Sequence, residues 1–181
     1  MAFKGKYPLR SKIVIHGQII EQVSSFNYLG FNISHNQNDD IDSKLNKFGR
    51  MCGTIRRHLR QKTLRCTQLK FYKTMATPML RDGSENWLLN RKDKRKIETT
   101  EMKFLRAVAG VTLLDHQRNE DIRNQLNIFN MTEQIITQKQ NWYTHLQRMN
   151  EERLPKIILN YRPTGRRDVG RPKTRWKQSL S

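Results

Sequence analysis

Residues 19–59 read IIEQVSSFNYLGFNISHNQNDDIDSKLNKFGRMCGTIRRHL, and this stretch decides the fold. Its second half places apolar residues four and three positions apart in turn, which puts them on one stripe of a helix. The stripe consists of Ile41, Leu45, Phe48, Cys52, Ile55 and Leu59. The opposite face carries the cations Lys44, Lys47, Arg50, Arg56, Arg57 and Arg60. Because such a helix must bury its apolar stripe, the rest of the chain is expected to supply packing partners.

The residues before this helix predict a small β-element. Residues 12–23 favour a hairpin, because β-branched runs flank His16-Gly17, a pair that suits a tight turn. Residues 26–33 predict a further strand, in which Gly30 indicates a bulge or the close approach of another backbone.

Three carboxylates, Asp39, Asp40 and Asp42, stand at the start of the long helix. They could form a divalent-metal pair, as in a polymerase, or they could cap the helix and interact with its dipole. No apolar strand leads directly into them, and this favours capping.

The remaining chain predicts a mainly α-helical protein. Helices are expected over residues 64–80, 91–109, 119–126 and about 131–149. Asn90 suits the N-cap and Gly110 the C-terminal stop of the second of these. Its first turns are crowded with cations, which is unfavourable to the helix dipole unless an anion binds there. A solvated basic surface is the alternative interpretation.

Charge points to a polyanionic partner. The 181 residues include 35 Lys and Arg against 16 Asp and Glu, a net charge of +19. An excess of this size costs self-repulsion in the compact state, so nucleic acid is the first candidate and an anionic membrane surface the second. No apolar run approaches the length that spans a bilayer, and the N-terminus lacks the apolar core of a secretory signal. With only two cysteines, these features predict an intracellular protein of the nucleus or cytoplasm, not a secreted one.

From Leu154 the composition changes to prolines, glycines and cations, which predicts a flexible basic tail. Gly170-Arg171-Pro172 resembles the centre of an AT-hook, which lies in the minor groove, although phosphate binding by the whole tail is the simpler interpretation. Trp176 could stack on bases or dock on the helical body.

Six short segments, taken in order, resemble the C-terminal part of the reverse transcriptase of non-LTR (LINE-like) retrotransposons, the endonuclease–reverse transcriptase family. They are Ser11–Gly17, Phe26–Gly30, Lys70–Lys73 with Pro78, Gly83–Trp87, Glu101–Arg106 and Gly170–Pro172. The resemblance implies that Phe26–Gly30 faces the primer end and that the first two long helices follow the template–primer duplex. The aromatic-x-Asp-Asp turn and second Asp that hold the family's catalytic metals do not occur at the expected place, so the chain alone is not expected to be an enzyme.

On this basis we expect a helical, thumb-like bundle with a small N-terminal β-hairpin element and a flexible basic C-terminal tail. The expected divisions are residues 1–36 as a palm edge, 37–152 as the thumb-like and following region, and 153–181 as the tail. The expected function is nucleic-acid binding within an RNA-directed DNA polymerase whose palm, fingers and endonuclease lie elsewhere. The alternative is a free-standing or domesticated basic module that binds DNA or RNA without any polymerase.

The expected partner is an RNA–DNA hybrid or a DNA duplex, together with the missing palm and fingers, and not a membrane. No catalytic residue, metal ligand or cofactor is expected in this chain, and Mg²⁺ is implied only for the missing palm. The candidate nucleic-acid-binding residues are Tyr28, Gly30, Lys47, Arg50, Arg56, Arg57, Arg60, Lys94, Arg95, Arg166, Arg167, Arg171, Lys173 and Arg175.

Overall fold

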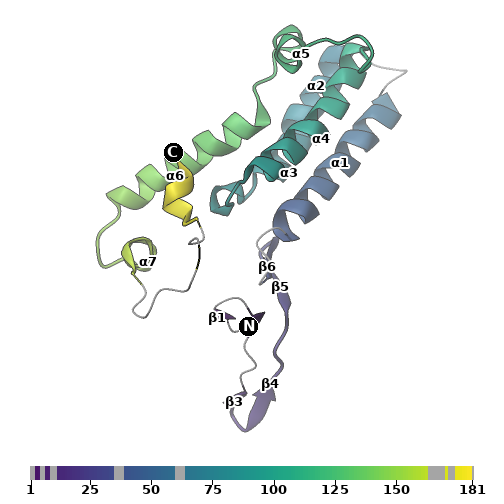
Figure 1. Cartoon of the computed structure of the whole chain (residues 1–181). Coiled ribbons are helices and arrows are strands. Elements are labelled where there is room, and N and C mark those ends of the chain that lie inside the picture. Colours follow the sequence, from purple (N-terminus) through teal and green to yellow (C-terminus); the bar gives the residue numbers. More distant parts are fainter. Residues whose placement is uncertain are drawn as a thin grey trace.

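The computed structural model describes residues 3–4, 7–8, 12–34, 39–59, 64–162, 170 and 174–180. It is mainly helical, with small antiparallel hairpins at the N-terminal end, as the sequence predicts. In Figure 1 the hairpins extend away from the N-terminal end of α1 (Asp39–Leu59), while α1 and α4 (Arg91–Ala109) lie side by side in the body. No helix in the described part of the chain is long and apolar enough to cross a membrane.

The N-terminal strands pair only within hairpins. β1 (Phe3–Lys4) pairs with β2 (Tyr7–Pro8), and β3 (Ile13–Ile15) pairs with β4 (Gln18–Ile20). The β3–β4 turn is His16-Gly17, with positive φ at both residues, as the sequence predicts. Both faces of this hairpin are exposed, so it buries no apolar face against the helical body.

The expectation of one continuous strand over residues 26–33 is wrong. The segment is a second hairpin, in which β5 (Ser25–Tyr28) pairs with β6 (Phe31–Ser34). Leu29 and Gly30 form its turn with φ of 48° and 84°. Gly30 therefore supplies the left-handed backbone of a tight turn instead of a bulge. Leucine rarely adopts a positive φ, so the sequence does not predict a turn at Leu29.

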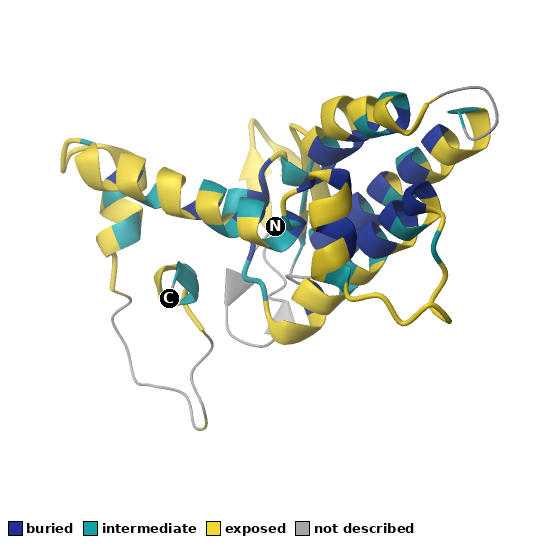
Figure 2. Cartoon of the chain, turned by 90° about the horizontal axis from the view of Figure 1, so that it is seen from above, coloured by how far each residue is buried: buried dark blue, intermediate teal, exposed yellow. Residues whose placement is uncertain are grey.

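The core forms where α1 (Asp39–Leu59) packs against α4 (Arg91–Ala109) and the helical segment between them. That segment consists of α2 (Arg65–Phe71), a π-helical turn η1 (Tyr72–Ala76) and α3 (Thr77–Arg81), so the expected single helix is interrupted by a wider turn. The apolar stripe of α1 is buried as predicted, with Leu59 partly covered. Figure 2 shows the buried residues gathered between these helices.

α4 is bounded as the sequence predicts. Asn90 accepts a hydrogen bond from the backbone N–H of Asp93, whose carboxylate accepts one from the N–H of Asn90, forming a capping box. Gly110 ends the helix at φ 78°. The 3₁₀ turn η2 (Ser84–Asn86) precedes α4. Downstream of α4 lie α5 (Asn119–Leu126) and α6 (Met131–Arg148), and the first half of α6 joins the core through Met131 and Ile135.

Two expectations about polar segments need correction. Lys44 does not lie on the exposed face of α1, because its side chain is buried and donates to the carbonyl of Asp82 while covering the ring of Phe31. The chain after Leu154 does not lack regular structure throughout: α7 (Leu154–Asn160) and a 3₁₀ turn η3 (Trp176–Leu180) lie within it. Pro155 indicates a break in regular structure, but it stands in the first turn of α7, where proline is tolerated.

Candidate nucleic-acid interface

The β5–β6 hairpin is fastened to the helical body by one polar cluster around Asp40. The Asp40 carboxylate accepts hydrogen bonds from the backbone N–H of Asn32 (3.1 Å) and from the indole Nε1 of Trp87 (2.8 Å). Lys44 lies one turn further along α1, with its Nζ 3.9 Å from the same carboxylate. Asp40 thus joins three separate segments, which is a structural role that the sequence did not reveal.

Asp42, which is also in the first turn of α1, accepts a 2.6 Å hydrogen bond from Lys96 of α4. This contact raises the pKa of Lys96. In the described residues, no group of three or more histidine, cysteine or acidic side chains is placed to hold a metal ion. The carboxylates of Asp40 and Asp42 are instead engaged by protein donors.

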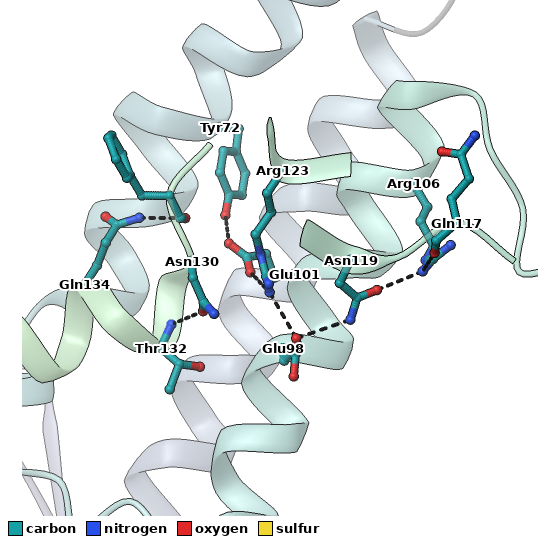
Figure 3. Close-up of polar contacts among 11 residues, drawn as sticks. Tyr72, Glu98, Glu101, Arg106, Gln117, Asn119, Arg123, Asn130, Thr132 and Gln134 are labelled. Atoms are coloured by element: carbon teal, nitrogen blue, oxygen red, sulfur yellow. Dashed lines mark hydrogen bonds and ion pairs between the residues drawn. The ribbon is translucent and has the colours of Figure 1, made fainter. Parts of the chain in front are cut away.

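A second polar cluster lies inside the core, where Figure 3 shows Tyr72, Glu101 and Arg123 converging. The fully buried Glu101 carboxylate accepts hydrogen bonds from the Tyr72 hydroxyl (3.1 Å) and from Arg123 Nη2 (3.0 Å). Burial raises the pKa of Glu101, and Arg123 opposes that shift. Tyr72 also stacks on Phe104 with ring centroids 5.0 Å apart. This cluster holds the segment from α2 to α3, α4 and α5 together inside the core.

A groove runs between α1 and α4 and has two parts. The polar pocket, about 750 Å³ in volume, lies at the N-terminal ends of both helices. It is lined by Asp42, Leu45, Asn46, Arg91, Lys92, Arg95, Lys96, Thr99 and Thr100. The mixed pocket, about 520 Å³ in volume, lies towards α5. It is lined by Arg56, Arg95, Glu98, Thr99, Met102, Lys103, Arg106, Ala107, Val111, Leu113 and Asn119. Arg95 and Thr99 line both pockets, so the two adjoin, and together we call them the α1–α4 groove.

The charges of the α1–α4 groove do not cancel. Its two carboxylates are already engaged, Asp42 by Lys96 and Glu98 by Arg123 (3.3 Å). Arg106 is also engaged, because its guanidinium donates to backbone carbonyls of the following loop and to Asn119. The other cations form no hydrogen bond or ion pair with the described residues. They are Arg56, Arg91, Lys92, Arg95 and Lys103.

Helix periodicity explains why these cations share one side. Along α4, Lys92, Arg95, Thr99, Lys103 and Arg106 follow one another three or four residues apart, which places them on one stripe. Most apolar residues of α4, among them Ile97, Leu105 and Val108, lie on the other side and are buried. On α1, Asn46 lines the groove and Arg50 stands one turn further, so Arg50 borders it.

The predicted site residues are not all brought together. Arg56 and Arg95 line the groove, and Arg50 and Arg57 lie seven residues apart on the adjoining face of α1, with Lys47 further round. Lys94 lies outside the groove on the side of α6, where its charge adds to burial, the larger cause, in lowering the pKa of Lys139.

Three other predicted residues are described and lie away from the groove. Tyr28 is exposed on the β5–β6 hairpin, Gly30 forms its turn, and Arg175 precedes η3. The rest of the predicted set, and the suggested AT-hook, fall on residues outside the described part of the chain. These are Arg60, Arg166, Arg167, Arg171 and Lys173.

Of the two roles that the sequence allows for Trp176, stacking on bases or docking on the helical body, the structure shows docking. Its indole Nε1 donates a 2.6 Å hydrogen bond to the carbonyl of Glu85, and its ring packs near Tyr143 of α6. Lys139 Nζ lies 5.2 Å from the ring centroid and donates to the Trp87 carbonyl. The indole is therefore engaged with the protein and does not project as a free stacking surface.

Sequence reasoning missed Lys103 and the apolar lining of the mixed pocket. Lys103 carried a usable signal, since it continues the cationic stripe of the predicted helix by helical spacing. Leu113 carried none, because the loop after Gly110 shows no periodicity and only the fold brings this side chain into the lining of the mixed pocket.

Comparison with known proteins gives a limited relationship. No family model matches the chain, and no solved structure matches it. A curated transposon-derived protein of Caenorhabditis elegans is 26% identical over 118 residues. The match covers 62% of this chain and 42% of that protein, so the chain spans less than half the length of its relative. This similarity points to an origin in a transposable element.

Proposed function

We propose that this chain is the nucleic-acid-binding C-terminal region of a retrotransposon reverse transcriptase and that it holds the nucleic-acid backbone in the α1–α4 groove. Under this proposal the polymerase chemistry belongs to a palm outside the chain, and the chain alone does not polymerise DNA. The similarity to a transposon-derived protein and the six ordered sequence segments support the origin. The binding role rests on different evidence.

The observation that carries the binding role is the set of uncompensated cations along the groove. Arg56 and Arg95 approach it from different helices, and the groove carboxylates are already paired. A phosphate that enters this groove gains charge-assisted hydrogen bonds without displacing an existing ion pair. Phosphate neutralisation also releases condensed counterions, which makes the affinity strongly dependent on salt.

Fluorescence anisotropy with labelled oligonucleotides at several salt concentrations tests the proposal. Arg95→Gln should weaken binding and reduce the slope of log K against log salt by about one, and Arg56→Gln should do the same. Lys70→Gln provides the matched control, because Lys70 is an exposed cation on α2 outside the groove. Binding that is insensitive to salt, or equal losses from Lys70→Gln and Arg95→Gln, would reject the groove as the binding surface.

A further inference from the structure

The mixed pocket of the α1–α4 groove differs from the polar pocket in one respect that phosphate binding does not explain. Its lining includes Met102, Ala107, Val111 and Leu113, whereas the apolar lining of the polar pocket is Leu45. A phosphate backbone gains nothing from apolar carbon. Cations at the rim and apolar carbon within indicate a ligand that carries a negative charge beside a flat, poorly hydrated group.

Leu113 is the informative residue of this pocket. Its side chain is 77% exposed, although it lies in a firmly held turn. The N–H and hydroxyl of Thr112 both donate to the Asp115 carboxylate, at 2.6 and 2.9 Å, and the N–H of His116 donates to the carbonyl of Leu113. Arg106 fastens the same loop by donating to the carbonyls of Thr112 and Gln117. The loop thus holds an apolar side chain at the pocket mouth.

We propose, as a step that rests on the proposed function, that the mixed pocket binds an unpaired nucleobase while Arg56, Arg95 and Lys103 hold the neighbouring phosphates. A base inside a duplex is stacked on both faces and cannot pack against Leu113. A base in a single strand or at a frayed end has a free face that can pack against this exposed side chain. The volume of about 520 Å³ lies within the usual range of small-ligand sites.

Charge complementarity favours this occupant over an apolar protein segment. Arg56 and Lys103 flank the apolar lining and have no partner among the residues that the structure describes. A purely apolar side chain would desolvate these cations and leave them unpaired, which is costly. A nucleotide supplies the base for the lining and the phosphate for the cations.

The neighbouring leucines provide a matched pair of variants. Leu113 lines the pocket, whereas Leu114 does not, and Leu114 is even more exposed at 84%. Leu113→Ser and Leu114→Ser are therefore both expected to fold, which circular dichroism can verify. The probes are a labelled single strand of about 12 nucleotides, the same strand with abasic sites, and the matching blunt duplex.

For the parent chain, anisotropy at low salt should show the base-bearing strand binding about fivefold more tightly than the abasic strand. Leu113→Ser should remove this preference and leave binding of the abasic strand and the duplex unchanged. Leu114→Ser should keep the preference. A parent chain with no preference, or a preference that survives Leu113→Ser, overturns the inference while leaving the Arg95-dependent phosphate binding intact. Absence of binding to all three probes rejects both proposals.

Discussion

Replacing Arg123 with methionine should destabilise this protein strongly, because it leaves a buried carboxylate without its cation. Glu101 has no exposed side-chain surface, and the Arg123 side chain is 7% exposed. Methionine fills much of the arginine volume, so the change removes charge and hydrogen bonds more than packing. The same substitution also frees Glu98, which is partly exposed and can be hydrated instead.

The expected loss in the free energy of unfolding is about 3–5 kcal/mol, the usual cost of breaking a buried ion pair on one side. The lower end of this range applies, because Glu101 keeps the 3.1 Å hydrogen bond from Tyr72. The backbone N–H of Met131 also remains as a donor to it. Arg118→Met is the control: Arg118 is exposed just before α5, and its loss should change stability by less than about 0.5 kcal/mol.

The pH dependence of this variant is a second check on the same reasoning. Burial already raises the pKa of Glu101 above its ordinary value of 4.5, and Arg123 opposes the rise. A carboxyl with a raised folded-state pKa favours the folded state at low pH, and this contribution is lost as the pH rises through that pKa. Without Arg123 the pKa of Glu101 rises further, so stability is lost over a range that extends to higher pH. The free energy of unfolding of the variant should therefore fall further below that of the parent chain at about pH 7 than at about pH 5.

Urea unfolding followed by far-ultraviolet circular dichroism measures both effects. Adding Glu101→Gln to Arg123→Met should recover part of the lost stability at neutral pH, because a neutral amide needs no cation and can still accept from Tyr72. If Arg123→Met costs less than about 1 kcal/mol, the buried cluster does not bear on stability as argued. The same conclusion follows if the double variant is no more stable than the single one.

Two further changes probe other parts of the fold. In Gly83→Ala, the new Cβ would lie 1.8 Å from the Phe31 ring, at a residue whose φ is 68°. The free energy of unfolding should therefore fall by clearly more than the roughly 1–2 kcal/mol that backbone strain alone would cost. Gly17→Ala meets no neighbouring atom, so urea unfolding should show the smaller loss there. Burial lowers the pKa of Lys139 to about 8, so stability should rise with pH between about 8 and the ordinary value of 10.5. For Lys139→Met, the free energy of unfolding measured with urea should change less with pH over this range.

Periodicity carried the prediction of the helical body and of its ends. The stripe of α1 and the boundaries of α4 follow from local sequence, since Asn90 and Gly110 act within a turn of their own positions. The tertiary polar contacts could not be read in this way. Lys44 looked like a surface cation because its acceptor, the carbonyl of Asp82, lies 38 residues away.

One buried contact did leave a signal in the sequence. Glu101 stands on the apolar stripe of its helix, between Ile97 and Leu105, where a carboxylate is costly unless a donor meets it. Its position therefore predicts a buried partner, although only the fold identifies Arg123. The prediction of the groove was partly right, because local clusters of charge indicate a cationic face. It was incomplete, because only the packing of the helices decides which cations share that face.

The sequence segments that suggested an origin differ in burial: Gly83–Trp87 and Glu101–Arg106 supply core residues, whereas the described parts of Ser11–Gly17 and Phe26–Gly30 are exposed. Phe31 lies directly after the Phe26–Gly30 segment and packs on Gly83, while Tyr72 stacks on Phe104 and bonds to Glu101. Segments far apart in the chain thus meet inside the protein, where they are constrained by packing. Arg56 and Arg95 lie outside these segments. A relative could therefore keep this fold and lose the groove, so binding has to be tested on the groove cations themselves.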